Sequence, residues 1–304
     1  MPISNIQKEN LLGSLLMVLA MATFAGEDSV IKFVSSALPV GQILFLLGLG
    51  GASIIFGFAI ILRKEVFSAD VFNKPMHFRV LSEVTGRVFY SSALALTPLT
   101  SSTMILQATP IVVVVGAAVF FKERVSALRW AAIFLGFFGV LIIIDPGSDS
   151  FSFLSILAVL GMLGFAGRDL ASRAVPKSLN IFTLGVHGFI SIAVSGVVLS
   201  FLLAEPFIWP DSSSWLYLLA GVFLGAIGYS AIISAMRIGE VSAITPFRYS
   251  RIIFGVAIGI LFFGENITLT AAIGCVLIVL SSLIVLQPGR HIQDQANLKR
   301  TDNE

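Results

Sequence analysis

Ten long apolar segments dominate this sequence and constrain its fold more than any other feature. A helix needs about 20 apolar residues to cross a hydrocarbon core of ~30 Å. Runs of that size lie at 11–34, 40–62, 76–96, 99–121, 128–145, 152–172, 180–203, 213–236, 241–262 and 268–287. Polar and apolar residues do not alternate within the runs, which argues against membrane-spanning strands. The sequence therefore predicts an all-α membrane protein with ten transmembrane helices.

The composition supports a chain surrounded by lipid. Hydrophobic residues make up 57% of the sequence and charged residues 12%, whereas a soluble domain carries about 25% charged residues. A net charge of +2 leaves no basic surplus for nucleic acid. The single cysteine, Cys275, forms neither an intrachain disulfide nor a metal-ligand pattern. We expect the lipid bilayer and a small-molecule substrate as partners, in a monomer or homodimer, and no nucleic acid, cofactor or metal.

The distribution of lysine and arginine predicts the orientation of the helices. Cytoplasmic loops of membrane proteins are enriched in both residues. If the helices alternate from a cytoplasmic N-terminus, the cytoplasmic segments hold 14 of the 19 basic residues: Lys8, Arg63, Lys64, Lys74, Arg79, Lys122, Arg124, Arg129, Arg173, Lys177, Arg237, Arg290, Lys299 and Arg300. The opposite loops hold acidic residues instead: Asp145, Asp149, Glu205, Asp211 and Glu265. No transit peptide is recognisable, so we expect a bacterial inner membrane with both termini in the cytoplasm.

The two halves of the chain resemble each other. The segment 24–28, Phe-Ala-Gly-Glu-Asp, recurs at 165–169 as Phe-Ala-Gly-Arg-Asp, and the segment 120–126 matches 262–268 at nearly the same offset. We predict a first repeat at 1–147, a second at 148–289 and a disordered cytoplasmic tail at 290–304. Five helices per repeat invert the second copy in the membrane. Inverted repeats are typical of secondary transporters, whose substrate site lies between the halves near the midplane.

The motifs within each half resemble those of a known family. Residues 93–147 contain Ala-Leu-x-x-Thr-Pro-Leu, then Phe-Phe-Lys-Glu-Arg-Val, then Asp-Pro-Gly, and the second half ends with Phe-Phe-Gly-Glu and Gln-Pro-Gly. This pattern resembles the EamA repeat of the drug/metabolite transporter superfamily. The resemblance implies a central cavity, lined by the first, third, fourth, sixth, eighth and ninth helices, that opens alternately to each side. Members carry amino acids, S-adenosylmethionine, riboflavin, amines or drugs.

Charged residues within the repeated segment are candidates for gating or coupling, because charge at membrane depth is costly. Glu27 and Asp28 occupy the outer part of the first helix, and Arg168 and Asp169 are their inverted counterparts. Adjacent side chains point about 100° apart, so one member of each pair faces the cavity. The two aspartates, which both repeats share, act in packing, in gating or in contact with substrate.

Two further charged pairs lie within predicted helices. Glu83 and Arg87 are four residues apart and share a face. They form either a self-neutralised pair or a proton-coupling site at Glu83. Arg248 and Arg251 are three apart with no acid on their own helix. The planar fork of arginine suits a carboxylate or phosphate. We therefore predict that they bind substrate beside Tyr249, unless Glu83, Asp28 or Asp169 pairs with them.

A few uncharged residues complete the predicted site. Gln107 and Tyr229 are cavity-lining candidates, with placement at the lipid interface the alternative for Tyr229. Besides these uncharged residues, the charged residue Arg87 is a further candidate for substrate contact. Pro110 and Pro246 remove backbone donors and predict bends. His187 is expected to be structural.

The preferred interpretation is a secondary transporter that moves a small organic solute with an anionic group, such as an amino acid, by alternating access. An exporter of drugs or toxic metabolites, or an uptake carrier for S-adenosylmethionine-like or riboflavin-like solutes, is the alternative. An integral-membrane enzyme would need a catalytic constellation that the three histidines do not suggest. A channel and a non-transporting scaffold are further rivals.

Overall fold

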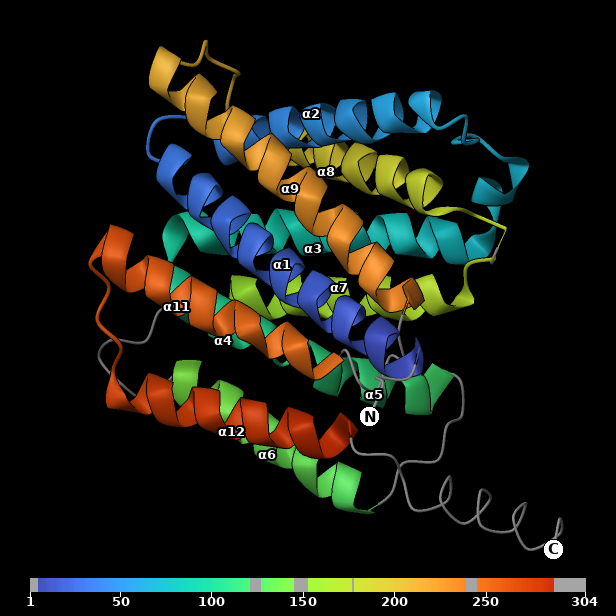
Figure 1. Cartoon of the computed structure of the whole chain (residues 1–304). Helices are drawn as coiled ribbons and strands as arrows, with labels where there is room; N and C mark the ends of the chain where they lie inside the picture. The colour runs from blue at the N-terminus through green and yellow to red at the C-terminus, as the bar shows by residue number, and fades with distance from the viewer. Residues whose placement is uncertain (1–4, 121–126, 145–152, 177, 239–244, 287–304) are drawn as a thin grey trace, which may run out of the picture.

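The computed structural model describes residues 5–120, 127–144, 153–176, 178–238 and 245–286, and all regular secondary structure in these ranges is helical. Figure 1 shows the helices in a single bundle. In chain order they are α1 (Asn5–Val34), α2 (Val40–Ile61), η1 (Ala69–Phe72), α3 (Lys74–Leu96), α4 (Leu99–Leu106), α5 (Thr109–Phe120), α6 (Ala127–Ile144), α7 (Ser155–Ala174), α8 (Ile181–Leu203), α9 (Ser212–Ile238), η2 (Thr245–Tyr249), α11 (Ser250–Phe263) and α12 (Leu269–Leu286). The tail predicted at 290–304 lies outside the described residues.

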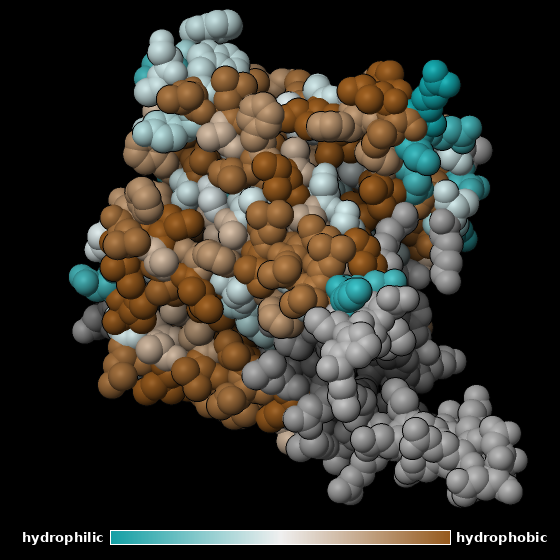
Figure 2. Space-filling view, viewed as in Figure 1, coloured by the Kyte–Doolittle hydropathy of each residue, from teal (hydrophilic) through white to brown (hydrophobic). Residues whose placement is uncertain are grey.

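The bundle presents apolar side chains to its surroundings. Five helices, α1, α2, α7, α8 and α9, are each long and apolar enough to cross a membrane. Large side chains such as Phe201 of α8, Leu216 of α9 and Phe262 of α11 are exposed, and Figure 2 shows the apolar surface spreading over the bundle. With α4 followed by α5 and η2 followed by α11, the elements make ten crossing segments. The chain is therefore a ten-helix membrane protein.

The packing partners show that the two halves are inverted copies. The most extensive contacts join α1 to α9, α3 to α7, α2 to α8 and α6 to α12. When the two halves are exchanged, α1 takes the position of α7 and α9 takes the position of α3. The α1–α9 contact thereby becomes the α7–α3 contact. The same exchange maps the other two contacts onto themselves. Figure 1 shows α2 and α8 at one edge, α6 and α12 at the opposite edge, and α1, α3, α7 and α9 between them.

Glycine allows the central helices to approach closely. A Cβ atom added at Gly164 of α7 would lie 2.4 Å from the backbone nitrogen of Gly86 on α3. At the edge of the bundle, Gly139 of α6 and Gly274 of α12 face each other's carbonyl oxygens in the same way. Small residues at such crossings bring helix backbones together in membranes. Gly139 and Gly274 therefore serve the packing of α6 against α12.

Two ends of the bundle are defined by contacts between loops. At one end, Ser178 donates to Asp70 at 2.6 Å and Asn180 donates to the Glu65 carbonyl at 2.6 Å. At the other end, Gln42 exchanges hydrogen bonds with the backbone of Ile208. The first end carries Arg63, Lys64 and Lys74, so it matches the end that the sequence predicts to be cytoplasmic.

The span predicted at 99–121 is interrupted close to the bend predicted at Pro110, because α4 ends at Leu106 and α5 starts at Thr109. Pro110 has no N–H group and its ring crowds the carbonyl four residues earlier. The Thr109 hydroxyl donates instead to the Leu106 carbonyl at 2.5 Å. The span predicted at 241–262 also differs, since its described part begins as the 3₁₀ helix η2 before α11.

Candidate functional site

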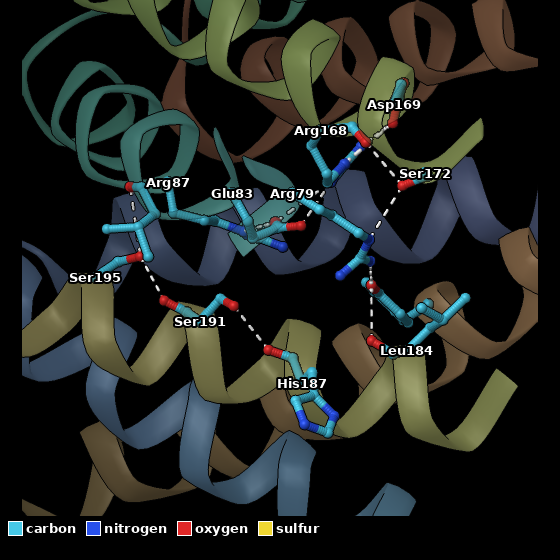
Figure 3. A network of polar contacts seen from close by, with 12 residues as sticks. Arg79, Glu83, Arg87, Arg168, Asp169, Ser172, Leu184, His187, Ser191 and Ser195 are labelled. Carbon is cyan, nitrogen blue, oxygen red and sulfur yellow. Dashed lines mark hydrogen bonds and ion pairs between the residues drawn. The ribbon is translucent and has the colours of Figure 1, made fainter. Parts of the chain in front are cut away.

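Glu83 on α3 lies at the centre of a buried network of charged side chains. Its side chain has no exposed surface, and its carboxylate contacts two guanidinium groups. Arg87, one turn along α3, places Nε 3.6 Å from Oε1, and Arg168 of α7 places Nη1 3.3 Å from the same oxygen. Figure 3 shows Glu83 between these arginines. The close approach of α3 and α7 at Gly86 and Gly164 brings the two helices' charges together.

The network continues to α1 through Arg87. Nη1 of Arg87 lies 3.4 Å from Oε1 of Glu27, whose side chain is 2% exposed. The Glu27 carboxylate packs against Gly225 of α9, where an added Cβ would lie 3.3 Å from the carboxyl carbon. Glycine at 225 therefore provides the space that Glu27 occupies. The Arg87 guanidinium also lies 5.8 Å from the ring centroid of Phe165.

In the opposite direction, the network reaches η2 through Asp169. Arg168 contacts Asp169 Oδ1 at 2.9 Å, and Arg248 contacts Asp169 Oδ2 at 3.4 Å. The Arg168, Asp169 and Arg248 side chains are 20%, 20% and 22% exposed. We name these three residues the accessible cluster. Among the central ion pairs, these side chains are the most exposed.

A separate ion pair joins α1 to α11. Arg251 Nη2 lies 2.5 Å from Asp28 Oδ2, and the Tyr90 hydroxyl donates to the same oxygen at 3.2 Å. The guanidinium group of Arg251 also lies 5.4 Å from the ring centroid of Phe24. Asp28 is 2% exposed and Arg251 is 15% exposed. This pair is therefore more deeply enclosed than the accessible cluster.

Arg248 and Arg251 each have a carboxylate partner on another helix. They pair with Asp169 and Asp28, which is the alternative that the sequence left open. Burial of a lone charge costs several kcal/mol, and a paired charge is far cheaper. The predicted Glu83–Arg87 contact is present, but it is not a self-contained pair, because each residue also contacts another helix. Any anionic solute that binds Arg248 must therefore compete with Asp169.

The uncharged candidates are buried near the network. Gln107 ends α4 and is 5% exposed, and Tyr249 ends η2 and is 8% exposed. Tyr229 is 6% exposed and donates to the Leu184 carbonyl at 3.3 Å, which excludes its placement at the lipid interface. His187 contacts the Thr183 carbonyl of its own helix at 2.8 Å. It lines a groove of about 560 Å³ at the surface, near η1.

Sequence reasoning missed Arg79, which it assigned to a cytoplasmic loop. Arg79 lies inside α3 and is only 4% exposed. Its Nε donates to the Ser172 hydroxyl at 3.1 Å, and its Nη2 donates to the Tyr229 hydroxyl. Its four-residue spacing from Glu83, on the same helical face, was the available signal.

A second polar cluster closes the opposite end of the bundle. Glu265, between α11 and α12, accepts the backbone N–H groups of Leu99 at 2.7 Å and Thr100 at 2.9 Å. It thereby caps α4, whose N-cap residue Pro98 provides no side-chain cap. Lys32 of α1 lies 3.7 Å from Glu265 and donates to the Thr97 carbonyl at 2.7 Å. We name Lys32, Glu265 and the start of α4 the end clamp. It joins the second half of the chain to the first.

Two inverted five-helix halves with ion pairs buried between their helices are an architecture typical of secondary transporters. The chain matches the EamA-like transporter family over residues 11–145 and 152–287, and it belongs to that family. The chain is accordingly a multi-pass membrane protein of the drug/metabolite transporter type.

Several characterised proteins are similar to it in sequence. A riboflavin transporter of Rhizobium johnstonii is 25% identical over 90% of this chain and 91% of its own length. The pseudopaline exporter CntI of Pseudomonas aeruginosa strain UCBPP-PA14 is 26% identical over 89% of this chain and 94% of its own. An S-adenosylmethionine uptake transporter of Rickettsia conorii is 21% identical, with coverage of 88% and 90%. A solved crystal structure shares the fold, with a TM-score of 0.61 and 20% identity over 91% of this chain and 97% of the other.

Proposed function

We propose that this protein is a secondary carrier that moves a small organic solute with an anionic group across a bacterial inner membrane by alternating access. The accessible cluster carries the proposal. It is the least enclosed part of the central network, and it presents two guanidinium groups around one carboxylate. Its residues come from α7 and η2, and Arg168 links it to Glu83 of α3.

The proposed binding step is an exchange of partners. A carboxylate of the solute takes the place of Asp169 on Arg248, so that the guanidinium keeps an anionic partner at each stage. Arginine suits this exchange because its planar fork accepts a carboxylate through two parallel N–H donors. Asp169 retains Arg168 at 2.9 Å during the exchange, so its own charge stays paired. The remaining central pairs, Glu27–Arg87 and Asp28–Arg251, hold the helices around the site.

The geometry of the ends suits alternating access. We propose that the repeats span 1–147 and 148–289, that both termini lie in the cytoplasm, and that the end clamp closes the outer end. In this arrangement the accessible cluster, toward the cytoplasmic ends of α7 and η2, is reached from inside. The names of the relatives support transport rather than catalysis, and they include both uptake and export.

A binding and transport assay tests the proposal. The purified protein is melted in the presence of amino acids, riboflavin and S-adenosylmethionine, since a ligand of the folded state raises its melting temperature. Solutes that raise the melting temperature are then tested for flux in liposomes that contain the protein. We expect Arg248→Ala to lose both binding and flux, while Lys64→Ala, an exposed basic residue outside the network, retains them. Equal binding by Arg248→Ala and the parent would contradict the proposed site.

A further inference from the structure

Arg79 is a deeply buried cation whose described contacts are all uncharged. It lies in the second turn of α3, with Ser172 of α7 and Tyr229 of α9 as its hydrogen-bond partners. Nη1 of the same guanidinium is buried and has no hydrogen-bond partner among the described residues. Arginine stays protonated in proteins. The site therefore holds a full positive charge and an unused donor.

The central arginines described above are each paired with a carboxylate, and Arg79 differs from them. Glu83 lies one turn away on α3, but its carboxylate is already in contact with Arg87 and Arg168. Within the described network, four carboxylates face four guanidinium groups, and these are Glu27, Asp28, Glu83 and Asp169 with Arg87, Arg168, Arg248 and Arg251. Arg79 adds one positive charge to this balance.

The surroundings of Arg79 favour an anion. Its hydrogen-bond partners, Ser172 and Tyr229, carry no negative charge that could balance the guanidinium group. Tyr229, whose hydroxyl accepts from Arg79, is also one of the residues that line a small cavity of about 20 Å³ beside Gly185 and Ser230. That volume holds roughly one water molecule. Tyr229 therefore contacts both the cation and this cavity.

We propose that Arg79 binds a single monoanionic group, and that this group is the carboxylate of the transported solute as it passes the cytoplasmic end of the network. The identification with the solute rests on the proposed function, whereas the anion site itself does not. Binding would supply the one negative charge that the described core lacks. It would also occupy Nη1 of Arg79, the donor without a partner.

The experiment compares small probes of the same shape but different charge. The purified full-length protein is melted in formate, in formamide and in chloride, with ionic strength held constant by the sodium salt of HEPES. Formate and formamide differ by little more than the charge. We expect formate, but not formamide, to raise the melting temperature with increasing concentration. Arg79→Gln should abolish this rise, and Arg79→Lys should shift it to higher formate concentration because the forked donor geometry is lost.

The variants also separate binding from folding. Arg79→Gln leaves no described carboxylate without its partner, so it should fold as well as the parent without added anion. Lys64→Gln, which removes an exposed positive charge outside the network, should keep the formate response. A response of equal size to chloride would support the site and assign it to a free inorganic anion, whereas a response to formate alone supports the carboxylate. A formate response that persists in Arg79→Gln, or none in the parent, would overturn the site.

Solute flux distinguishes this inference from the proposed function. Flux that requires Arg248 but not Arg79 would remove Arg79 from the transport route and leave the carrier in place. An Arg79-dependent formate response without flux of any solute would preserve the anion site and remove the carrier assignment.

Discussion

At the scale of single residues, the central carboxylate of the network has the largest expected effect. Glu83 has no exposed surface and holds Arg87 and Arg168 from different helices. Loss of one member of a buried ion pair leaves its partner uncompensated, which costs about 3–5 kcal/mol. We expect Glu83→Gln to lower the free energy of unfolding by about that amount, measured by circular dichroism in detergent. Glu205→Gln, at an exposed loop position, should change little.

The energetic coupling between Glu83 of α3 and Arg168 of α7 can be measured directly with a double-mutant cycle. If Glu83 stabilises the fold through Arg168, removing both charges costs less than the sum of the single changes. Contacting residues in such cycles show coupling of about 0.5–3 kcal/mol. We therefore expect Glu83→Gln with Arg168→Gln to fall short of additivity within that range. Strict additivity would show that the 3.3 Å contact contributes nothing to stability.

Pairs within one helix could be predicted from the sequence, and pairs between helices could not. The four-residue spacing of Glu83 and Arg87 placed them on one face, as the structure shows. Asp28 and Arg251 are 223 positions apart, and their contact depends on how α1 packs against α11. Arg79 was misplaced because basic residues near a helix start are usually exposed, and only the packing of α7 and α9 encloses it.

At the scale of elements, the crossing of α3 and α7 depends on the absence of a side chain at Gly164. A methyl group there would lie 2.4–2.5 Å from the backbone of Gly86, which cannot yield as a flexible side chain would. We expect Gly164→Ala to lower stability by about 1–3 kcal/mol. Gly57→Ala on α2, where nothing lies within 4 Å, should instead be neutral or stabilising by about 0.5–1 kcal/mol. Thermal melting of the two variants side by side compares these effects.

The start of α9 provides a pH-dependent element outside the membrane span. Asp211 accepts the Ser214 N–H at 3.1 Å and the Ser213 hydroxyl, and these hydrogen bonds lower its carboxyl pKa to about 2. An unfolded aspartate has a pKa of about 3.9. Because the folded pKa is the lower one, the stabilising effect is present above about pH 4 and is lost as the pH falls toward 2.

Tryptophan fluorescence can follow this cap, because Trp209 and Trp215 lie beside it with ring centroids 5.9 Å apart. In a Trp130→Phe background, we expect a fluorescence change between pH 4 and pH 2. Asp211→Asn retains a capping oxygen but cannot titrate there, so the change should disappear. A transition that survives in this variant would have to come from another group.

The helical elements themselves were largely predictable, because hydropathy reports the length of apolar runs. The division of the predicted 99–121 helix into α4 and α5 was less so. Pro110 indicated a bend, but the position of the break depends on the Thr109 hydroxyl, which donates a hydrogen bond to the Leu106 carbonyl. The cap on α4 could not be foreseen at all, since its acceptor Glu265 comes from a loop 166 residues away.

At the scale of the whole molecule, the orientation in the membrane can be tested by labelling. Lys64 and Ser178 lie at the end expected in the cytoplasm, and Ser36 and Ser213 lie at the other; all four are exposed. In a Cys275→Ser background, we expect an impermeant maleimide on intact cells to label Ser36→Cys and Ser213→Cys only. Lys64→Cys and Ser178→Cys should react after permeabilisation. Labelling of Ser36→Cys and Ser178→Cys from the same side would contradict the bundle's topology.

The two halves share a fold but only some of their charges. At the offset of 142 residues, the positions of Arg248 and Arg251 correspond to Leu106 and Thr109 in the first half. Both aspartates of the repeated segment therefore pair with arginines from the second half alone. In a carrier with two identical halves, each half could adopt the conformation of the other, and the resulting second state would have the same free energy. If the protein alternates between two states as proposed, exchange of the halves cannot re-form the same salt bridges in the second state. The two states then need not be equal in free energy, and each ~1.4 kcal/mol between them changes the ratio of their populations tenfold.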